Sequence, residues 1–78
     1  MTNIQTQTVV MLCRTLKPAA RLFAKIEGQY IRLEEREGSH LLRCLLVHPT
    51  NHTERIQTTL LDLAAICQDE QVSLHAEN

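Results

Sequence analysis

His48 and His52 have the spacing in this 78-residue chain that most resembles a metal site. Two histidines four positions apart on a helix can share a zinc ion. Pro49 lies between them, and a proline at this point places His48 before any helix that contains His52. Glu54 is the only other residue near them at ligand spacing. We therefore interpret both histidines as loop and cap residues and expect no metal and no cofactor.

The cysteines offer no better arrangement for catalysis. A nucleophilic thiol needs an adjacent histidine and an orienting acid. Cys44 precedes His48 by four residues, which along a strand is a separation of about 13 Å. Cys13 and Cys67 stand within apolar runs, and a buried thiol is unreactive. Because the cysteines are three in number and far apart, we expect three buried free thiols in a reducing compartment rather than a disulfide framework.

Other signs of an enzyme are also weak. The carboxylates of the run LEEREG are consecutive, which is typical of a solubilising charge run rather than an acid–base pair. The chain contains only two glycines and no glycine-rich phosphate loop. The sequence therefore predicts a protein without enzymatic activity; a small enzyme or a metal-binding protein is the least favoured alternative.

Four basic residues precede the first acidic residue, Glu27. Spacings of three, four and four would align them on one helical face, where they could meet phosphate or an acidic protein surface. Pro18 interrupts any such helix, so a solvated face balanced by the acidic remainder of the chain is the favoured interpretation. Nucleic-acid binding through this basic stripe is the second hypothesis. The stripe consists of Arg14, Lys17, Arg21 and Lys25.

The most clearly patterned element of the sequence is a helix predicted over residues 51–69. Ile56, Leu60, Leu63 and Cys67 recur at helical spacing, and no glycine or proline interrupts the run. Asn51 stands at the expected N-cap, and Glu54, three positions later, would complete a capping box.

The N-terminal third can be interpreted in two ways. Residues 3–16 fit a helical repeat, yet the run VVMLC also suits a buried strand over residues 8–14. Pro18 prevents one uninterrupted helix from continuing beyond it. We favour the helix.

Three short runs with alternating polarity follow, separated by turns that contain Gly28 and Gly38. They predict an antiparallel meander, although the second run, YIRLEERE, would also suit a surface helix. Val72 and Leu74 either form a short last strand or belong to a disordered tail.

The sequence thus predicts a single α+β domain over residues 1–78. A three-stranded antiparallel meander packs against the C-terminal helix and an N-terminal helix; the alternative is an N-terminal strand, giving a four-stranded sheet with one helix. The alternation puts polar residues on the open sheet face: Lys25, Arg32, Glu34 and Arg43.

The order helix, three strands, helix resembles that of the double-stranded-RNA-binding domain. That family contacts phosphate through a basic first turn of its last helix and a Gly-Pro-x-His loop. Here the corresponding residues are NHTER, and the chain contains no Gly-Pro sequence. The resemblance is therefore one of element order alone.

The third strand carries more apolar residues than one sheet face can use, which favours a partner that covers them. We therefore expect a small non-catalytic module that binds another protein, self-associates as a homodimer, and resides in the cytoplasm without contacting a membrane. Such proteins are typical accessory regulators or inhibitors on bacterial chromosomes, phages and plasmids. The expected interface combines the basic stripe with three residues of the third strand: Leu42, Arg43 and Leu45.

Overall fold

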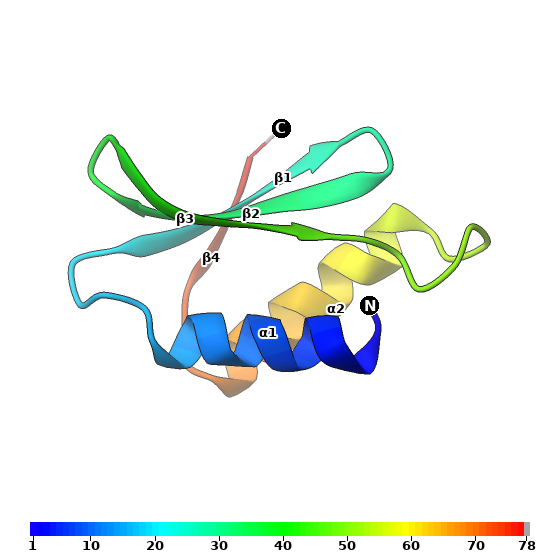
Figure 1. The fold of residues 1–78 in the computed structure, drawn as a ribbon, viewed down its shortest axis with the longest axis horizontal. Helices are drawn as coiled ribbons and strands as arrows, with labels where there is room; N and C mark the ends of the chain where they lie inside the picture. Colours follow the sequence, from blue (N-terminus) through cyan, green and yellow to red (C-terminus); the bar gives the residue numbers. More distant parts are fainter. Residues whose placement is uncertain (78) are drawn as a thin grey trace.

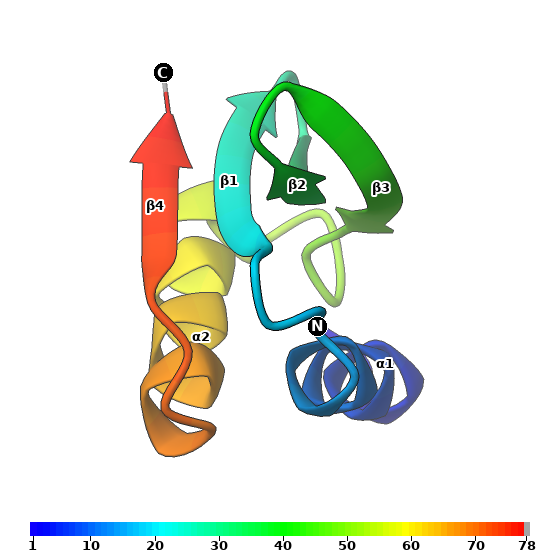
Figure 2. The same ribbon diagram turned by 90° about the vertical axis from the view of Figure 1, so that its left-hand side faces the viewer.

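The computed structural model describes residues 1–77 and has the element order α1-β1-β2-β3-α2-β4. The helices are α1, Asn3–Arg14, and α2, Ile56–Asp69. The strands are β1, Arg21–Glu27, β2, Tyr30–Glu37, β3, His40–Val47, and β4, Leu74–Glu77. They form one sheet in the order β3-β2-β1-β4, and both helices lie on the same side of it (Figures 1 and 2).

The predicted N-terminal helix is confirmed, and the competing strand over residues 8–14 is wrong. Thr2 explains where α1 begins, because its hydroxyl accepts the N–H of Gln5 while the Gln5 side chain accepts the N–H of Thr2. This capping box satisfies two of the donors left free at a helix N-terminus. Val9 and Leu12 then face the core from one side of the helix.

The predicted meander is also confirmed. β1 and β2, and β2 and β3, pair in antiparallel fashion. Their turns contain Gly28 and Gly38 with φ near 57° and 59°, a left-handed conformation that glycine adopts without steric cost. The two glycines therefore explain why YIRLEERE forms a hairpin strand and not a surface helix.

The possible last strand exists as β4, which pairs in parallel with β1. A parallel neighbour requires a crossover, and α2 provides it across the covered face of the sheet. Arg36 of β2 reaches across β1 and donates to both carboxylate oxygens of Glu77 at 2.7 and 3.0 Å, which fastens the short strand to the sheet.

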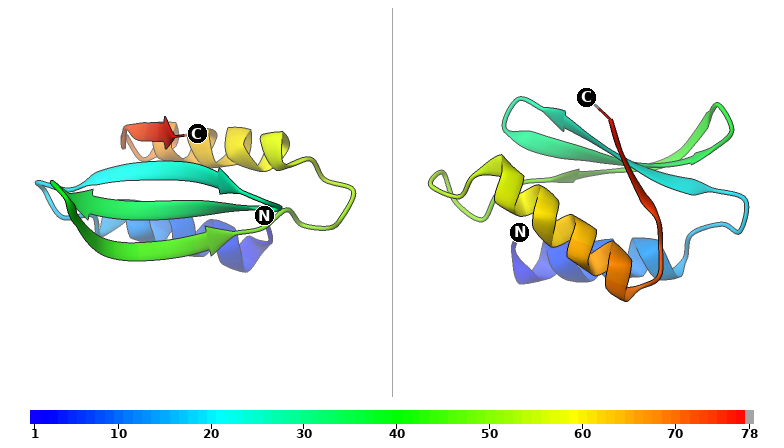
Figure 3. Two further views of the ribbon diagram at one scale, coloured as in Figure 1. Left: turned by 90° about the horizontal axis from the view of Figure 1, so that it is seen from above. Right: turned by 180° about the vertical axis from the view of Figure 1, so that it is seen from behind.

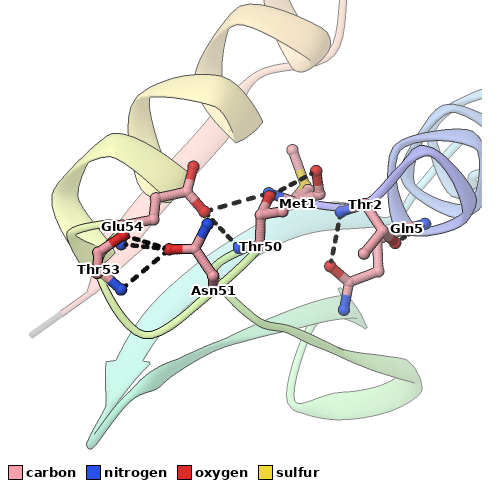
Figure 4. A network of polar contacts seen from close by, with 7 residues as sticks. All are labelled: Met1, Thr2, Gln5, Thr50, Asn51, Thr53 and Glu54. Carbon is pink, nitrogen blue, oxygen red and sulfur yellow. Dashed lines mark hydrogen bonds and ion pairs between the residues drawn. The ribbon is translucent and has the colours of Figure 1, made fainter.

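The predicted start of the long helix is wrong by five residues, whereas its predicted end at residue 69 is confirmed. Asn51 does not cap α2; its side-chain oxygen accepts the N–H groups of Thr53 and Glu54 in a local turn (Figure 4). The Glu54 carboxylate accepts the N–H of Thr50 and lies 3.5 Å from the α-amino group of Met1. The two residues predicted to cap the helix, Asn51 and Glu54, therefore stabilise the loop before α2 instead.

A small core fills the space between the sheet and the helices. α1 lies below β2 and β3, and α2 lies below β1 and β4 (Figure 2). The buried apolar side chains come from both helices and from the first three strands: Val9, Leu12, Cys13, Leu22, Ala24, Ile31, Leu33, Val47, Leu63 and Cys67. None of the helices within residues 1–77 is long and apolar enough to cross a membrane.

Candidate protein-interaction surface

Arg43 lies on the helix-covered side of the sheet, so its predicted position on the open face is wrong. It pairs with Glu35, whose side chain is buried, and its guanidinium donates to the hydroxyl and the carbonyl of Thr15 at 2.8 and 3.1 Å. Glu35 also accepts the backbone N–H of Lys17 at 2.9 Å. These contacts join the C-terminal end of α1 to the centre of the sheet.

The hydrogen bond and charge of Arg43 lower the pKa of Glu35 below its usual value, although burial acts in the opposite direction. The carboxylate is therefore ionised at neutral pH, and the charge of Arg43 is balanced within the chain. Arg43 is the only arginine or lysine of β3, and the strand contains no acidic residue.

The outer face of α1 is apolar and uncharged. Ile4 is 77 % exposed and Met11 is 58 % exposed, and Thr8 lies between them on the same helical face. No acidic or basic residue occurs in α1 before Arg14. Water therefore covers two large apolar side chains on the side of α1 that points away from the core.

β3 adds a second apolar strip beside this helix face. It is an edge strand that pairs only with β2, so one row of its backbone N–H and C=O groups has no partner within residues 1–77. Leu41 and Leu46, which pair with Arg36 and Arg32 and therefore lie on the open face of the sheet at this edge, are 49 % and 42 % exposed. Cys44 is also exposed, so the prediction that all three thiols are buried is wrong for this residue.

A hollow of about 200 Å³ joins the two strips. It lies between α1 and β3, which run along the same edge of the molecule (Figure 3, left). Its lining is contributed by both elements: Thr8, Met11, Leu12, Arg43, Cys44 and Leu45. We call α1–β3 surface the area that runs from the outer face of α1 through this hollow and around the β3 edge to the open face of the sheet. It is defined by Ile4, Thr8, Met11, Leu41, Cys44, Leu45 and Leu46.

Two of the three predicted interface residues of β3 thus line this hollow. Leu45 also packs against the core, while the head group of Arg43 is held by Glu35. Leu42 lies at a register shift, where it has no partner residue in β2, and is half-buried. The sequence analysis did not identify Ile4 and Met11 as interface residues. Their helical spacing, which places them opposite the buried Val9 and Leu12, could have indicated an exposed apolar face.

The structure does not gather the basic stripe on one helix. Arg14 ends α1 and pairs at 2.7 Å with Glu70, the C-cap residue of α2. Lys17 lies in the following loop, and Arg21 and Lys25 lie four positions apart in β1. The four cations therefore belong to three different elements or connections.

The open face of the sheet is covered by a paired network. Glu34 accepts hydrogen bonds from Arg32 and Arg36, and the Arg36 guanidinium lies 4.3 Å from the centre of the Phe23 ring. Phe23 in turn contacts His75 of β4, with ring centres 5.2 Å apart. The charges on this face largely satisfy one another and leave little free potential for a charged ligand.

The histidine region forms a separate polar hollow of about 500 Å³, near the start of α2. It is lined by the first turn of the meander and the loop after β3, including His48, His52 and Glu54. His48 packs against the Tyr30 ring, and Glu54 is held by Thr50. No cluster of three or more histidine, cysteine, aspartate or glutamate residues within residues 1–77 is arranged to hold a metal ion.

The remaining thiols lie between the two helices. Cys13 and Cys67 are buried, as predicted. Burial raises the pKa of Cys13, and it raises the pKa of Cys67 to about 12, so both groups stay protonated at neutral pH. They act as small apolar core residues.

We find no match to this chain among protein-family models, curated proteins or solved structures.

Proposed function

We propose that this protein is a small non-catalytic interaction module that binds another protein through the α1–β3 surface, as an accessory regulator or inhibitor does. The observation that carries the proposal is the continuity of an exposed, uncharged helix face, an apolar hollow and an unpaired strand edge. Large exposed apolar areas on small proteins are typical of interaction sites. A free strand edge adds backbone donors and acceptors that an extended partner segment can use.

The charge distribution supports this surface over the basic stripe. Arg14 and Arg43 are held by carboxylates of the same chain, so neither is free to recruit a ligand. By contrast, the large apolar side chains of Ile4, Met11, Leu41 and Leu46 on the α1–β3 surface are exposed to solvent. Binding would therefore depend mainly on apolar contacts and strand hydrogen bonds and only weakly on salt.

A matched set of variants tests the proposal. Met11→Lys and Leu46→Lys place a charge on the surface, whereas Leu61→Lys changes a leucine of α2 that is 70 % exposed and lies outside it. Each tagged variant, with folding checked by circular dichroism, is used to capture protein from a lysate of the source cells and from a solution of the untagged chain. We expect wild type and Leu61→Lys to retain a stoichiometric protein that Met11→Lys and Leu46→Lys lose. Equal retention by all four, or by none, would contradict the proposal.

A further inference from the structure

We propose that the occupant of the α1–β3 surface is a second copy of this chain, whose β3 strand pairs in antiparallel fashion with the first to form an eight-stranded sheet. This inference rests on the proposed function and names the partner. A two-fold interface brings the same patch of each subunit together, so any net charge on the patch would repel itself. The α1–β3 surface meets this condition, because α1 has no charge before Arg14 and Arg43 is neutralised by Glu35.

The edge of β3 has two of the features that keep edge strands apart, the register shift at Leu42 and the inward-pointing Arg43, but it lacks the others. Proteins commonly protect such edges with proline, lysine or an inward-pointing charge. β3 contains no proline or lysine, and its inward-pointing Arg43 is already paired. Residues 43–47, beyond the register shift, therefore present unpaired backbone groups with which another strand can pair.

The proposed pairing has its two-fold axis at Cys44. A two-fold axis perpendicular to the sheet keeps the covered face of one copy continuous with the covered face of the other. Centring the axis on Arg43 would set two guanidinium groups directly opposite each other, which is destabilising. Centring it on Cys44 avoids this and sets Leu45 opposite Arg43, within residues 43–47, the part of β3 that keeps a regular alternation.

The same axis brings the two α1 helices together under the joined sheet. α1 lies below β2 and β3 and follows the β3 edge (Figures 2 and 3). Met11 and Thr8 line the hollow at this edge, so the second copy would cover the hollow from the side. Apolar helix contact would then add to the strand hydrogen bonds.

In this register the two copies of Cys44 lie opposite each other, so a disulfide between them would report the dimer. Directly opposite residues of an antiparallel pair have Cα atoms about 4.5–5.5 Å apart, within the range a disulfide needs. We expect diamide, which accepts the two electrons and two protons of the thiol pair, to convert wild type into a covalent dimer. Cys44→Ser should remain uncrosslinked, because the other two thiols are buried.

A second variant tests the register and excludes random collision. In Leu46→Cys with Cys44→Ser, the new thiol is also exposed, but the two copies of residue 46 would lie about 13 Å apart along the strands. This variant should cross-link far more slowly than wild type. Equal rates for the two proteins would overturn the proposed register.

Sedimentation of the reduced protein separates this inference from the proposed function. We expect a species of twice 8.9 kDa for wild type and Leu61→Lys, and a monomer for Leu46→Lys. A wild-type monomer at high micromolar concentration would overturn the inference. If a lysate protein is still lost specifically with Leu46→Lys, the proposed function stands with a different partner; if not, both fail.

Discussion

Glu35 is the residue on which the junction between α1 and the sheet depends. Its side chain is 1 % exposed, while that of Arg43 is 43 % exposed, so the carboxylate carries most of the burial cost and the guanidinium remains partly hydrated. A buried carboxylate without its partner would be strongly unfavourable. The ion pair therefore stabilises the fold by giving the buried carboxylate a partner. It also neutralises the charge of Arg43 on the edge strand β3.

We predict that Glu35→Gln lowers the free energy of unfolding by about 2 kcal/mol at neutral pH, since a charge-assisted hydrogen bond becomes a neutral one. The folded-state pKa of Glu35 lies below its ordinary value of 4.5. The carboxylate thus stabilises the fold above that value and loses this contribution as the pH falls through the folded-state pKa. Urea unfolding as a function of pH should show the difference between wild type and variant shrinking in acid.

Glu37→Gln is the matched control, because Glu37 is an exposed glutamate of the same strand. It should leave the stability at neutral pH almost unchanged. A difference between wild type and Glu35→Gln that stays constant down to strongly acidic pH would show that the ionised carboxylate is not the stabilising group.

At the scale of elements, the end of α2 contains a local strain that the sequence does not reveal. Gln71 has φ near 59°, a left-handed conformation that favours glycine. The N–H of Val72 bonds to the carbonyl of Cys67, and the N–H of Gln71 bonds to that of Gln68. This is the usual way in which a helix ends before turning back, and β4 depends on it for its direction.

We predict that Gln71→Gly raises the free energy of unfolding by about 0.5–1 kcal/mol, because it removes the steric cost of the left-handed backbone at an exposed position. Gln71→Ala keeps the strain and should bring no gain. Thermal and urea unfolding of the three proteins measure the difference. Equal stability of the glycine and alanine variants would mean that the backbone conformation at residue 71 carries no cost.

The elements were largely predictable from the sequence, and their details were less so. The meander followed from alternation and from Gly28 and Gly38, because a local pattern and a turn residue agree there. The start of α2 was missed because Asn51 caps a turn as readily as a helix. β4 was left open because its four residues are held by β1 and by Arg36, which are distant in the sequence.

The candidate site shows the same limit. The excess of apolar residues in the third strand is the sequence feature that pointed to β3. It could not show that Arg43 points towards the helices, or that α1 lies beside this edge, because both depend on tertiary packing. Likewise, Cys44 stands in an apolar run and looked buried, yet it occupies the uncovered face of an edge strand.

At the scale of the whole molecule, the two edges of the sheet differ. β4 is short and is fastened by the ion pair of Glu77 with Arg36. β3 is twice as long, is apolar, and lies beside an exposed helix face. The proposed interface therefore lies at the β3 edge of the molecule, with the histidine hollow and the open face over β1 and β4 outside it.

Amide hydrogen exchange of the wild-type chain at low and at high micromolar concentration locates the interface between copies without any substitution. We predict that exchange slows at high concentration in β3 and along the outer face of α1, while the amides of β4 exchange at the same rate in both samples. Concentration-independent exchange in β3 with newly protected amides in β4 or across the open face would contradict the account.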